Sequence, residues 1–362
     1  MPSSTALVAT PAALEDLIGS LEGDALGVDT EFLRERTYRA ELCLLQLTSS
    51  AGPVCVDPLT LGELEPLRRV FGAQGPLKVL HAARQDIEVL APVVGMVTPL
   101  FDTQIAAALA GFPAQVGYAE LVRRLLNIEL PKAQTRTDWS RRPLSPEQLE
   151  YALDDVRYLL PLRERLLDDL ERLQRRAWLD EDLRALQDPA AIAVVPANAW
   201  RRFKGVEALD EGRLALLRAL AEWREQRAID RNRPRGWILD DAVLREIVQR
   251  VPRDREELAR VEAMPEGVVK HSGDDLLALI DAARIPSPPP PLPRRERPDP
   301  LRVARIKRLS QRVQRVAEEL AIAPEVLATR KDLEAIAHGA SPHTILQGWR
   351  AALLAATLLA TD

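Results

Sequence analysis

The chain has 362 residues, of which 46% are hydrophobic and 28% are charged, and its formal net charge is −5. This length allows two or three domains with separate cores, and the composition is ordinary for a globular protein. Two isolated cysteines exclude a disulfide framework. Because the chain also lacks a signal-like leader and a bilayer-length apolar run, we expect a cytoplasmic protein that makes no membrane contact.

Charge is distributed unevenly along the chain. Residues 1–190 contain 20 basic and 29 acidic residues, a net charge of −9, whereas residues 191–285 contain 17 of each. Residues 286–362 contain 12 basic and 8 acidic residues, a net charge of +4. A polyanionic partner would therefore be attracted mainly by the last part of the chain, and the acidic first part is suited to cations.

The first half of the chain contains both strand and helix patterns. Three apolar runs separated by polar or glycine-containing turns predict a strand meander at residues 25–29, 42–47 and 53–57. The next segment predicts a short strand that ends near Leu80 and a helix around Asp86, followed by helices at 102–111 and 118–128. This order indicates an α/β domain in which helices flank a mixed sheet.

A strongly marked helix begins at Ser145, its N-cap, with Pro146 in the first helical position and Gln148 completing a capping box. We expect this helix to bend or break near Pro161. Beyond about Trp178 the pattern is helical throughout, and four amphipathic segments predict a compact bundle. These segments are residues 213–232, 240–250, 254–261 and 272–284.

A proline-rich segment from Ile285 to Pro300 predicts a semi-rigid linker before a last helical region. We therefore divide the chain into four parts. They are an α/β domain at 1–190, a helical domain at 207–285, a linker at 286–299 and a second helical domain at 300–362.

The sequence GVDTEF, residues 27–32, places two carboxylates at the end of an apolar strand. Asp29 and Glu31 point to the same face because strand side chains alternate with a period of two, and Thr30 points to the other. Two like charges on a half-buried face repel each other and lose hydration. A divalent cation between them would relieve both costs.

Other oxygen donors occur further along the chain. Asp86 lies at the start of its helix, and Tyr151 and Asp155 share one helix face because they are four residues apart. Carboxylates suit Mg²⁺ or Mn²⁺, and a pair of such ions is a common means of cleaving phosphodiesters. Each residue by itself also fits a structural role, as a helix cap, a solvated helix face or a turn residue.

Six segments of the chain, in their order and spacing, resemble the ribonuclease D family of 3′–5′ exoribonucleases. They are DTEFLRERTYRAELCLLQL, LHAARQDIEVL, FDTQIAAAL, GYAELV, KAQTRTDWSRRPLS and YALDDVRYLLPL, and the resemblance covers roughly residues 20–170. The family belongs to the DEDD superfamily, with a tyrosine four residues before the last aspartate. Residues 207–285 resemble an HRDC domain, and residues 300–362 resemble a second, more divergent one.

This resemblance implies a ribonuclease H-like exonuclease domain followed by two HRDC-type helical domains. It further implies that two divalent cations, Mg²⁺ or Mn²⁺, are held by Asp29, Glu31, Asp86 and Asp155. Asp29 would bridge the ions, and Tyr151 would orient the attacking water. The implied substrate is RNA with a free 3′ end, tRNA precursors above all, and the implied product is a nucleoside 5′-monophosphate.

Several further residues are candidates for binding RNA. Phe32 and Leu33 could stack on the terminal base, and Arg136 and Trp139 lie in an apparent loop before the catalytic helix. In the helical regions the candidates are Arg231, Arg305, Arg308 and Arg312, the last three on a basic segment at 302–315. Core packing of the apolar side chains and simple solvation of the arginines are the alternatives.

Two other functions compete with the exoribonuclease hypothesis. One is a DNA 3′–5′ exonuclease of the same superfamily, and the other is a catalytically silent RNA-binding scaffold. We expect a monomer. We also expect that cutting the chain after Ile285 leaves chemistry on a short oligomer nearly unchanged and weakens binding to a structured RNA.

Overall fold

The computed structural model describes residues 7–21, 23–131, 137–283, 285 and 299–359. The chain divides into two compact units, each described here by itself. The first contains residues 1–33, 42–192 and 298–362, and the second contains residues 34–41 and 193–297. Residues 34–41, which link two neighbouring strands of the first unit, therefore belong by their contacts to the second unit.

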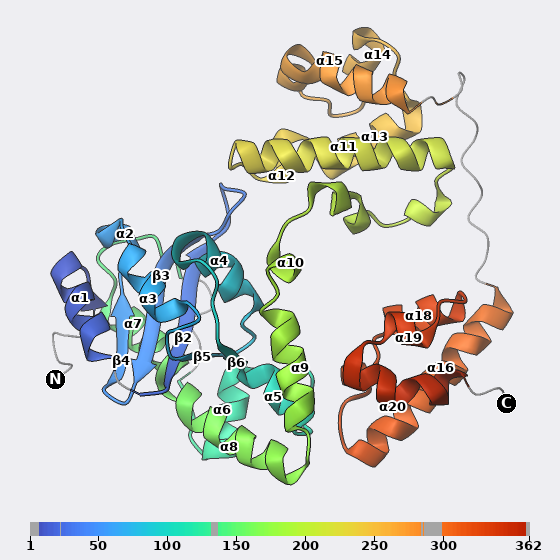
Figure 1. Cartoon of the computed structure of the whole chain (residues 1–362). Coiled ribbons are helices and arrows are strands. Elements are labelled where there is room, and N and C mark those ends of the chain that lie inside the picture. The colour runs from blue at the N-terminus through green and yellow to red at the C-terminus, as the bar shows by residue number, and fades with distance from the viewer. Residues whose placement is uncertain (1–6, 22, 132–136, 284, 286–298, 360–362) are drawn as a thin grey trace. The chain divides into compact units, whose positions relative to one another are not determined.

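A sheet of six strands lies among the helices of the α/β part of the first unit, as far as this part is described (Figure 1). The strands are β1 (Leu7–Val8), β2 (Ala25–Leu33), β3 (Glu41–Ser49), β4 (Gly52–Val56), β5 (Leu77–Leu80) and β6 (Leu100–Asp102). Their order is β1-β4-β3-β2-β5-β6, so the predicted meander of β2, β3 and β4 is confirmed. β3 and β4 are antiparallel, whereas β2, β5 and β6 run parallel, which makes the sheet mixed.

Helices pack on this sheet as expected for the predicted α/β class. They are α1 (Pro11–Ser20), α2 (Pro58–Leu61), α3 (Arg68–Phe71), α4 (Arg84–Val94), α5 (Thr103–Leu109), α6 (Tyr118–Leu126), α7 (Pro146–Arg157), α8 (Leu159–Arg172), α9 (Arg176–Leu186) and α10 (Pro189–Ile192). The capping box predicted at Ser145 and Gln148 is present at the start of α7.

The break in the long helix lies at Tyr158, three residues before Pro161. Pro161 has no N–H for the carbonyl of Arg157, and its ring clashes with that carbonyl in a continuous helix. The disruption therefore occurs one turn before the proline. Close approach of α8 to the sheet depends on Gly27, because a Cβ there would lie 2.4 Å from Cγ2 of Thr48 and 3.2 Å from Cβ of Leu159.

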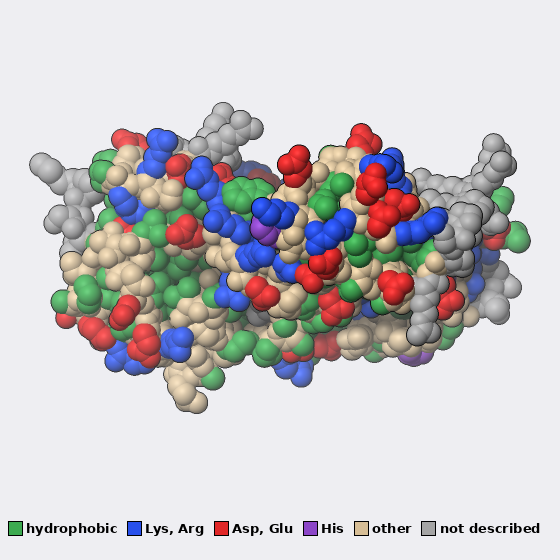
Figure 2. Space-filling view, turned by 90° about the horizontal axis from the view of Figure 1, so that it is seen from above, with side chains coloured by type: hydrophobic (Ala, Val, Ile, Leu, Met, Phe, Trp, Pro, Cys, Tyr) green, Lys and Arg blue, Asp and Glu red, His purple; other side chains and the backbone are tan. Residues whose placement is uncertain are grey.

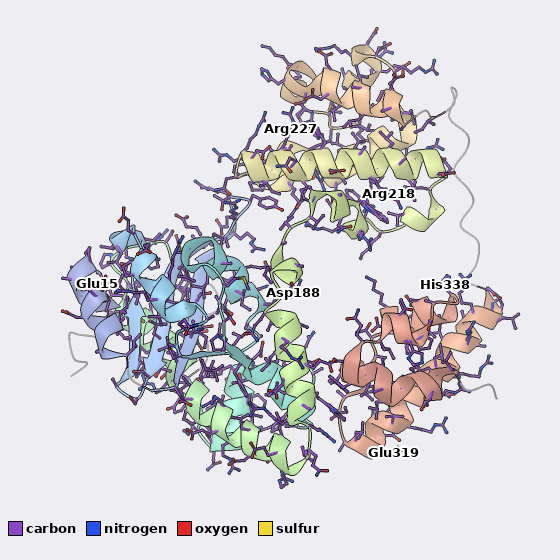
Figure 3. The ribbon with its side chains drawn as sticks, viewed as in Figure 1. Glu15, Asp188, Arg218, Arg227, Glu319 and His338 are labelled. Carbon is purple, nitrogen blue, oxygen red and sulfur yellow. The ribbon has the colours of Figure 1, made fainter. Side chains whose placement is uncertain are left out.

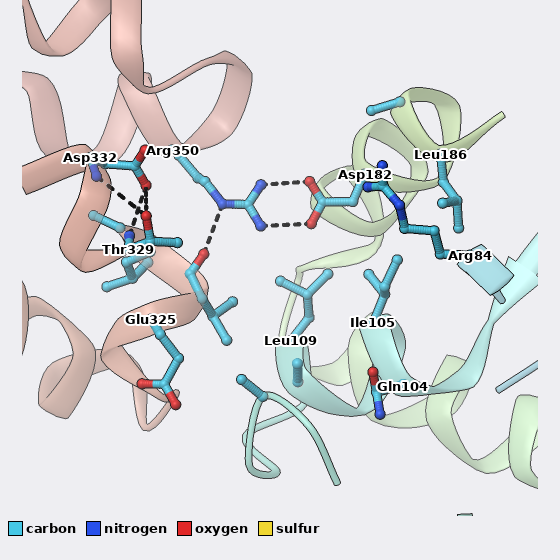
Figure 4. A pocket seen from close by; sticks show the side chains of 16 residues that line it. Arg84, Gln104, Ile105, Leu109, Asp182, Leu186, Glu325, Thr329, Asp332 and Arg350 are labelled. Atoms are coloured by element: carbon cyan, nitrogen blue, oxygen red, sulfur yellow. Dashed lines mark hydrogen bonds and ion pairs between the residues drawn. The ribbon is translucent and has the colours of Figure 1, made fainter. Parts of the chain in front are cut away.

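The last helical region packs against the α/β domain within the first unit. Its helices are α16 (Pro300–Leu320), α17 (Pro324–Leu327), α18 (Arg330–Ala337), α19 (Pro342–Ile345) and α20 (Gly348–Leu359). Buried residues of α9, such as Leu179, share one hydrophobic cluster with Leu309 of α16 and Leu354 of α20. Arg350 of α20 also forms a bidentate ion pair with Asp182 of α9, which links the same two regions (Figure 4). The domain limits expected from the sequence, at residues 190, 207, 285 and 300, stay predictions.

The second unit is an all-helical bundle. It contains α11 (Glu211–Asp230), α12 (Arg235–Ile238), α13 (Asp241–Arg250), α14 (Arg255–Ala259) and α15 (Glu266–Ala282), together with short 3-10 turns at Pro196–Arg202 and Val206–Ala208. Glu225 on α11 is fully buried and accepts hydrogen bonds from Tyr38, Arg202 and Arg235. These bonds fasten residues 34–41 to the bundle, since a buried carboxylate needs such partners.

Arginines of α11 also pack on aromatic rings of the bundle. Arg218 lies over Trp200, 4.5 Å from the ring centroid, and Arg227 lies over Trp223 at 4.8 Å; both arginines are marked in Figure 3. On the face shown in Figure 2, Lys and Arg side chains are interspersed with Asp and Glu side chains. Among the described residues, no helix has both the length and the apolar character needed to span a bilayer.

Candidate active site

The acidic residues singled out from the sequence lie at the carboxyl ends of adjacent parallel strands. Asp29 and Glu31 lie in the second half of β2, and Asp86 lies in the first turn of α4, which follows β5. Gly27 pairs with Val79 of β5, so the ends of β2 and β5 lie at the same edge of the sheet. Open sheets with parallel strands bind ligands at this edge.

The carboxylates influence one another strongly. Burial and the charges of Asp86, Asp155 and Glu31 raise the pKa of Asp29 well above its usual value. Burial is also the main cause that raises the pKa of Glu31 to about 8 and those of Asp86 and Asp155 to about 7. Three segments far apart in the sequence, β2, α4 and α7, thus bring four acids into one partly dehydrated cluster.

Tyr151 and Asp155 reach this cluster from α7. Burial and the charges of Asp155 and Glu31 raise the pKa of the Tyr151 hydroxyl, which also hydrogen-bonds to Asp155. Trp139 packs beside Tyr151, with ring centroids 6.2 Å apart, and only 6% of Trp139 is exposed. The side chain of Trp139 therefore supports Tyr151 by packing, and its burial leaves little surface on which a base could stack.

Thr30 contributes to the site in a way that strand alternation did not predict. Its hydroxyl donates a hydrogen bond of 2.5 Å to Oδ1 of Asp86. Asp86 meets the Thr30 side chain from α4, which packs against β2. The sequence signal is a threonine between two acidic residues, but only the packing of α4 beneath β2 reveals its partner.

Asp102 connects the start of α5 with residues 82–83, which come just before the helix α4 that carries Asp86. Its carboxylate accepts hydrogen bonds from the backbone N–H groups of Ala82 and Ala83 and caps α5 through those of Gln104 and Ile105. Ala82 has a φ of 57°, a left-handed conformation that is unfavourable for alanine and needs such support. Asp102 thus caps α5 and also supports residues 82–83, which precede α4.

Tyr118 fixes the junction between α7 and α8. Its hydroxyl donates to the carbonyl oxygen of Asp154 at 3.0 Å and accepts from the N–H of Tyr158 at 3.1 Å. The ring of His81 packs edge-on against Tyr118, and Nε2 of His81 bonds the carbonyl of Val116. His81 is therefore structural, and Tyr118 stabilises the backbone beside Asp155.

The donor set of the cluster fits divalent cations. Asp29, Glu31, Asp86 and Asp155 supply carboxylate oxygens, the ligands that Mg²⁺ and Mn²⁺ prefer. A cation would also compensate the repulsion that raises the pKa of Asp29. Among the described residues, no group of three His, Cys, Asp or Glu side chains has the geometry of a formed metal site. The carboxylates of the acidic cluster would therefore have to move closer together when a cation binds.

The other candidates for RNA binding occupy different environments. Phe32 and Leu33 are half-buried at the end of β2, and Leu33 packs against the cluster that contains Trp139. Arg136 lies outside the described residues. Arg231 is exposed at the end of α11, whereas the neighbouring Arg224 is buried and pairs with Asp241.

Comparison with known proteins decides the family. Residues 5–171 match the 3′–5′ exonuclease domain family, and residues 213–280 match the HRDC domain family. The chain is 40% identical to ribonuclease D of Gluconacetobacter diazotrophicus over 350 residues, which is 93% of this chain and 88% of that protein. It belongs to the ribonuclease D family.

Other ribonuclease D proteins agree with this assignment. That of Jannaschia sp. is 39% identical over 92% of this chain and 88% of its own length. The crystal structure of Escherichia coli RNase D, described as an exoribonuclease involved in structured RNA processing, matches with a TM-score of 0.82 and 30% identity. This match covers 97% of the present chain and 96% of the Escherichia coli chain.

Membership of the ribonuclease D family establishes the activity. The chain is a 3′–5′ exoribonuclease with an exonuclease domain of mixed sheet and helices, followed by an HRDC helical region. The exonuclease family works with divalent metal ions. The fold class and the enzyme class expected from the sequence are thus confirmed.

Proposed function

We propose that this exoribonuclease cleaves RNA with two divalent cations, Mg²⁺ or Mn²⁺, held by Asp29, Glu31, Asp86 and Asp155. The observation that carries the proposal is the convergence of these four carboxylates from β2, α4 and α7 at one edge of the sheet, which together with burial raises the pKa of Asp29. Such a cluster is costly for the fold unless positive charge binds to it. Asp29 would lie between the two ions.

The side chains around the cluster have separate tasks in this mechanism. The ions would supply an activated water and stabilise the attacking and leaving oxygens of the phosphodiester. Tyr151 would orient the attacking water and assist removal of its proton, since it shares a helix face with Asp155. Thr30 would hold Asp86 in place through its hydrogen bond. The product is a nucleoside 5′-monophosphate.

We assign the substrate as structured RNA with a free 3′ end, tRNA precursors above all. The Escherichia coli relative is an exoribonuclease involved in structured RNA processing, and the present chain is similar to it over nearly its whole length. Phe32 and Leu33 lie at the end of the strand that carries Asp29, and this position supports the proposal that they contact the terminal nucleotide. Arg136 and Arg231 would contact the RNA further along, and Trp139 would act through Tyr151. We propose a monomeric, cytoplasmic enzyme.

One time course tests the metal and residue assignments. An RNA labelled in its 3′-terminal nucleotide should release a labelled mononucleotide with Mn²⁺ and none with EDTA. Asp155→Asn should abolish this release, whereas Asp154→Asn, the neighbouring acid on another helix face, should stay near wild type. Equal activity of both variants would contradict the assignment of Asp155.

The same assay distinguishes the two rival functions. Faster digestion of a deoxyribo-oligomer than of the matching RNA would favour a DNA exonuclease. RNA binding without any release, in the presence of Mg²⁺ or Mn²⁺, would favour a silent scaffold. The matches to ribonuclease D over most of the chain favour neither.

A further inference from the structure

Among the described side chains, only Gln46 of β3 is buried with two polar atoms that both lack a hydrogen-bond partner. Its exposed fraction is 0%, and neither Oε1 nor Nε2 is bonded to another described residue. Its neighbours in the strand, Leu45 and Leu47, are fully buried as well. An amide that loses its bonds to water without replacement destabilises a fold. Such a group therefore indicates a partner that is present only in the working enzyme.

A close approach between Gly27 and Thr48 shows to which face of the sheet Gln46 points. A Cβ on Gly27 would lie 2.4 Å from Cγ2 of Thr48, so the two positions are neighbours on one face of β2 and β3. The connection between these strands, residues 34–40, is shorter than the crossover of about a dozen residues that parallel strands need. The strands are therefore antiparallel. Two residues further toward the connection, Asp29 and Gln46 are neighbours on the same face.

Helix α7 covers this face of the sheet. Cys55 of β4 pairs directly with Gln46 and therefore points to the same side. Cys55 belongs to one hydrophobic cluster with Ala152 of α7. The same helix carries Tyr151 and Asp155. The amide of Gln46 is thus enclosed between β3 and the helix that brings these two residues to the acidic cluster.

The carboxylate of Asp29 lies within reach of this amide. Cross-strand neighbours on one face have Cβ atoms about 4.5–5.5 Å apart, a gap that a glutamine side chain can span. Asp29 accepts a backbone hydrogen bond from Thr30. An ionised carboxylate offers about four acceptor sites, so Asp29 can accept a further hydrogen bond while it binds a cation.

We propose that Gln46 positions Asp29 in the cation-loaded enzyme. Nε2 of Gln46 donates to a carboxylate oxygen of Asp29 when the acidic cluster closes on a cation, and Oε1 accepts from a water molecule of that cation. The proposal rests on the proposed function, because it takes Asp29 as a ligand of the cations. Hydrogen bonds from surrounding residues orient metal-bound carboxylates, and their removal weakens metal binding or activity by about 10–100-fold.

The variant Gln46→Met tests this role, because it keeps the length of the side chain and removes the amide. In EDTA it should be as stable as the wild type or more stable, since an unpaired buried amide is lost. Mn²⁺ binding, followed by the EPR signal of the free ion, should be about 10–100-fold weaker. Release of nucleotide from a dinucleotide should need correspondingly more Mn²⁺, whereas KM at saturating Mn²⁺ should be unchanged.

Thr48→Val is the matched control. Thr48 is buried on the same face of the same strand, but its neighbour across β2 is Gly27 and not Asp29. This substitution removes a polar atom and keeps the shape of the side chain. We expect the control to bind Mn²⁺ as the wild type does.

Three outcomes would overturn the proposal. One is wild-type affinity of Gln46→Met for Mn²⁺, and another is an equal loss of affinity in Thr48→Val, which would mean a general disturbance of β3. The third is a lower stability of Gln46→Met than of the wild type in EDTA, which would mean that the amide supports the metal-free fold. The proposed function is contradicted by a different result, namely a wild-type enzyme that releases no nucleotide from RNA with Mn²⁺.

Discussion

Trp178 of α9 and Trp349 of α20 stack face to face, with ring centroids 4.4 Å apart and planes inclined by only 4°. The indole N–H of Trp349 also donates to Asp182, and its backbone N–H donates to Glu181. Residues more than 160 positions apart in the chain thus share one packed contact. The last helical region is therefore part of the structure that carries the active site.

Asp182 is expected to stabilise this contact substantially. Its carboxylate accepts from Nη1 and Nη2 of Arg350 at 2.6 and 2.9 Å, and both side chains are mostly buried. Asp182→Asn should lower the free energy of unfolding by about 1.5–3 kcal/mol, the usual contribution of hydrogen bonds to charged groups. Urea unfolding followed by tryptophan fluorescence measures this.

A surface pair supplies the control for Asp182. Asp169 pairs with Arg172, whose side chain is 71% exposed, so Asp169→Asn should change stability by no more than about 0.5 kcal/mol. Equal effects of the two substitutions would mean that the contact with Arg350 contributes little.

Removal of the chain after Ile285 should damage the remaining enzyme, contrary to the expectation from the sequence that chemistry on a short oligomer would hardly change. Leu109, Leu179 and Leu183 belong to a cluster that residues of α16 and α20 complete, and each exposed leucine costs about 1.5–3 kcal/mol. We expect the truncated protein to aggregate or to unfold at a clearly lower temperature. If the truncated enzyme had the melting temperature and the short-oligomer activity of the wild type, the last helical region would not be needed for the fold of the active site.

Tyr118 should act as a positioning residue for Asp155. Tyr118→Phe keeps the packing on His81 and removes both hydrogen bonds at the α7–α8 junction. Two hydrogen bonds at about 0.5–1.5 kcal/mol each predict roughly a tenfold loss of kcat, together with a higher Mg²⁺ concentration for half-maximal rate. The Mg²⁺ requirement is the decisive measurement, because simple destabilisation would not change it.

Tyr158→Phe is the matched control for Tyr118. It preserves the backbone N–H that bonds Tyr118, and the structure records no hydrogen bond from the Tyr158 hydroxyl to a described residue. An increase in the Mg²⁺ requirement of this variant as large as in Tyr118→Phe would argue against a specific role for Tyr118.

Asp29→Asn should abolish hydrolysis without weakening the metal-free fold. Burial and three neighbouring acids already disfavour the charged form of Asp29, so a neutral amide relieves repulsion. We expect thermal stability in EDTA to be unchanged or slightly higher. Asp24→Asn, at an exposed position just before β2, should leave both activity and stability unchanged. Near-wild-type turnover of Asp29→Asn would refute its role in metal binding.

The ion pair between Asp57 and Arg142 should give a defined dependence of stability on pH. Burial raises the pKa of Asp57, but hydrogen bonds from Arg142 and Thr60 outweigh it and lower the pKa below its usual value. The folded state therefore favours the carboxylate, and this contribution is complete above the pKa of about 3.9 in the unfolded chain. It is lost as the pH falls through the lower pKa of the folded state.

The variant Asp57→Asn isolates this effect. It should be clearly less stable than wild type at pH 7, because Arg142 also holds the carbonyls of Cys43 and Trp139 in place. The difference between the two proteins in urea unfolding should shrink as the pH is lowered below about 4. A difference that stays constant down to pH 3 would show that the charge of Asp57 is unimportant.

Local elements and the order of motifs were decided by the sequence itself. The capping box at Ser145, the cap at Asp102 and the strand meander depend on neighbouring residues, whose spacing is visible in the chain. Even the helix break was predicted to within three residues, because the effect of Pro161 acts over one turn. The family also followed from motifs that retain their order along the chain.

Contacts between distant segments were decided only by the tertiary structure. The partner of Thr30 lies 56 residues away, that of Tyr38 lies 187 away, and that of Asp182 lies 168 away. Residues 34–41 link two strands of the first unit yet pack in the second. No periodicity or spacing encodes such pairs, because they arise when separately formed surfaces bury apolar area and the polar groups at those surfaces must then find partners.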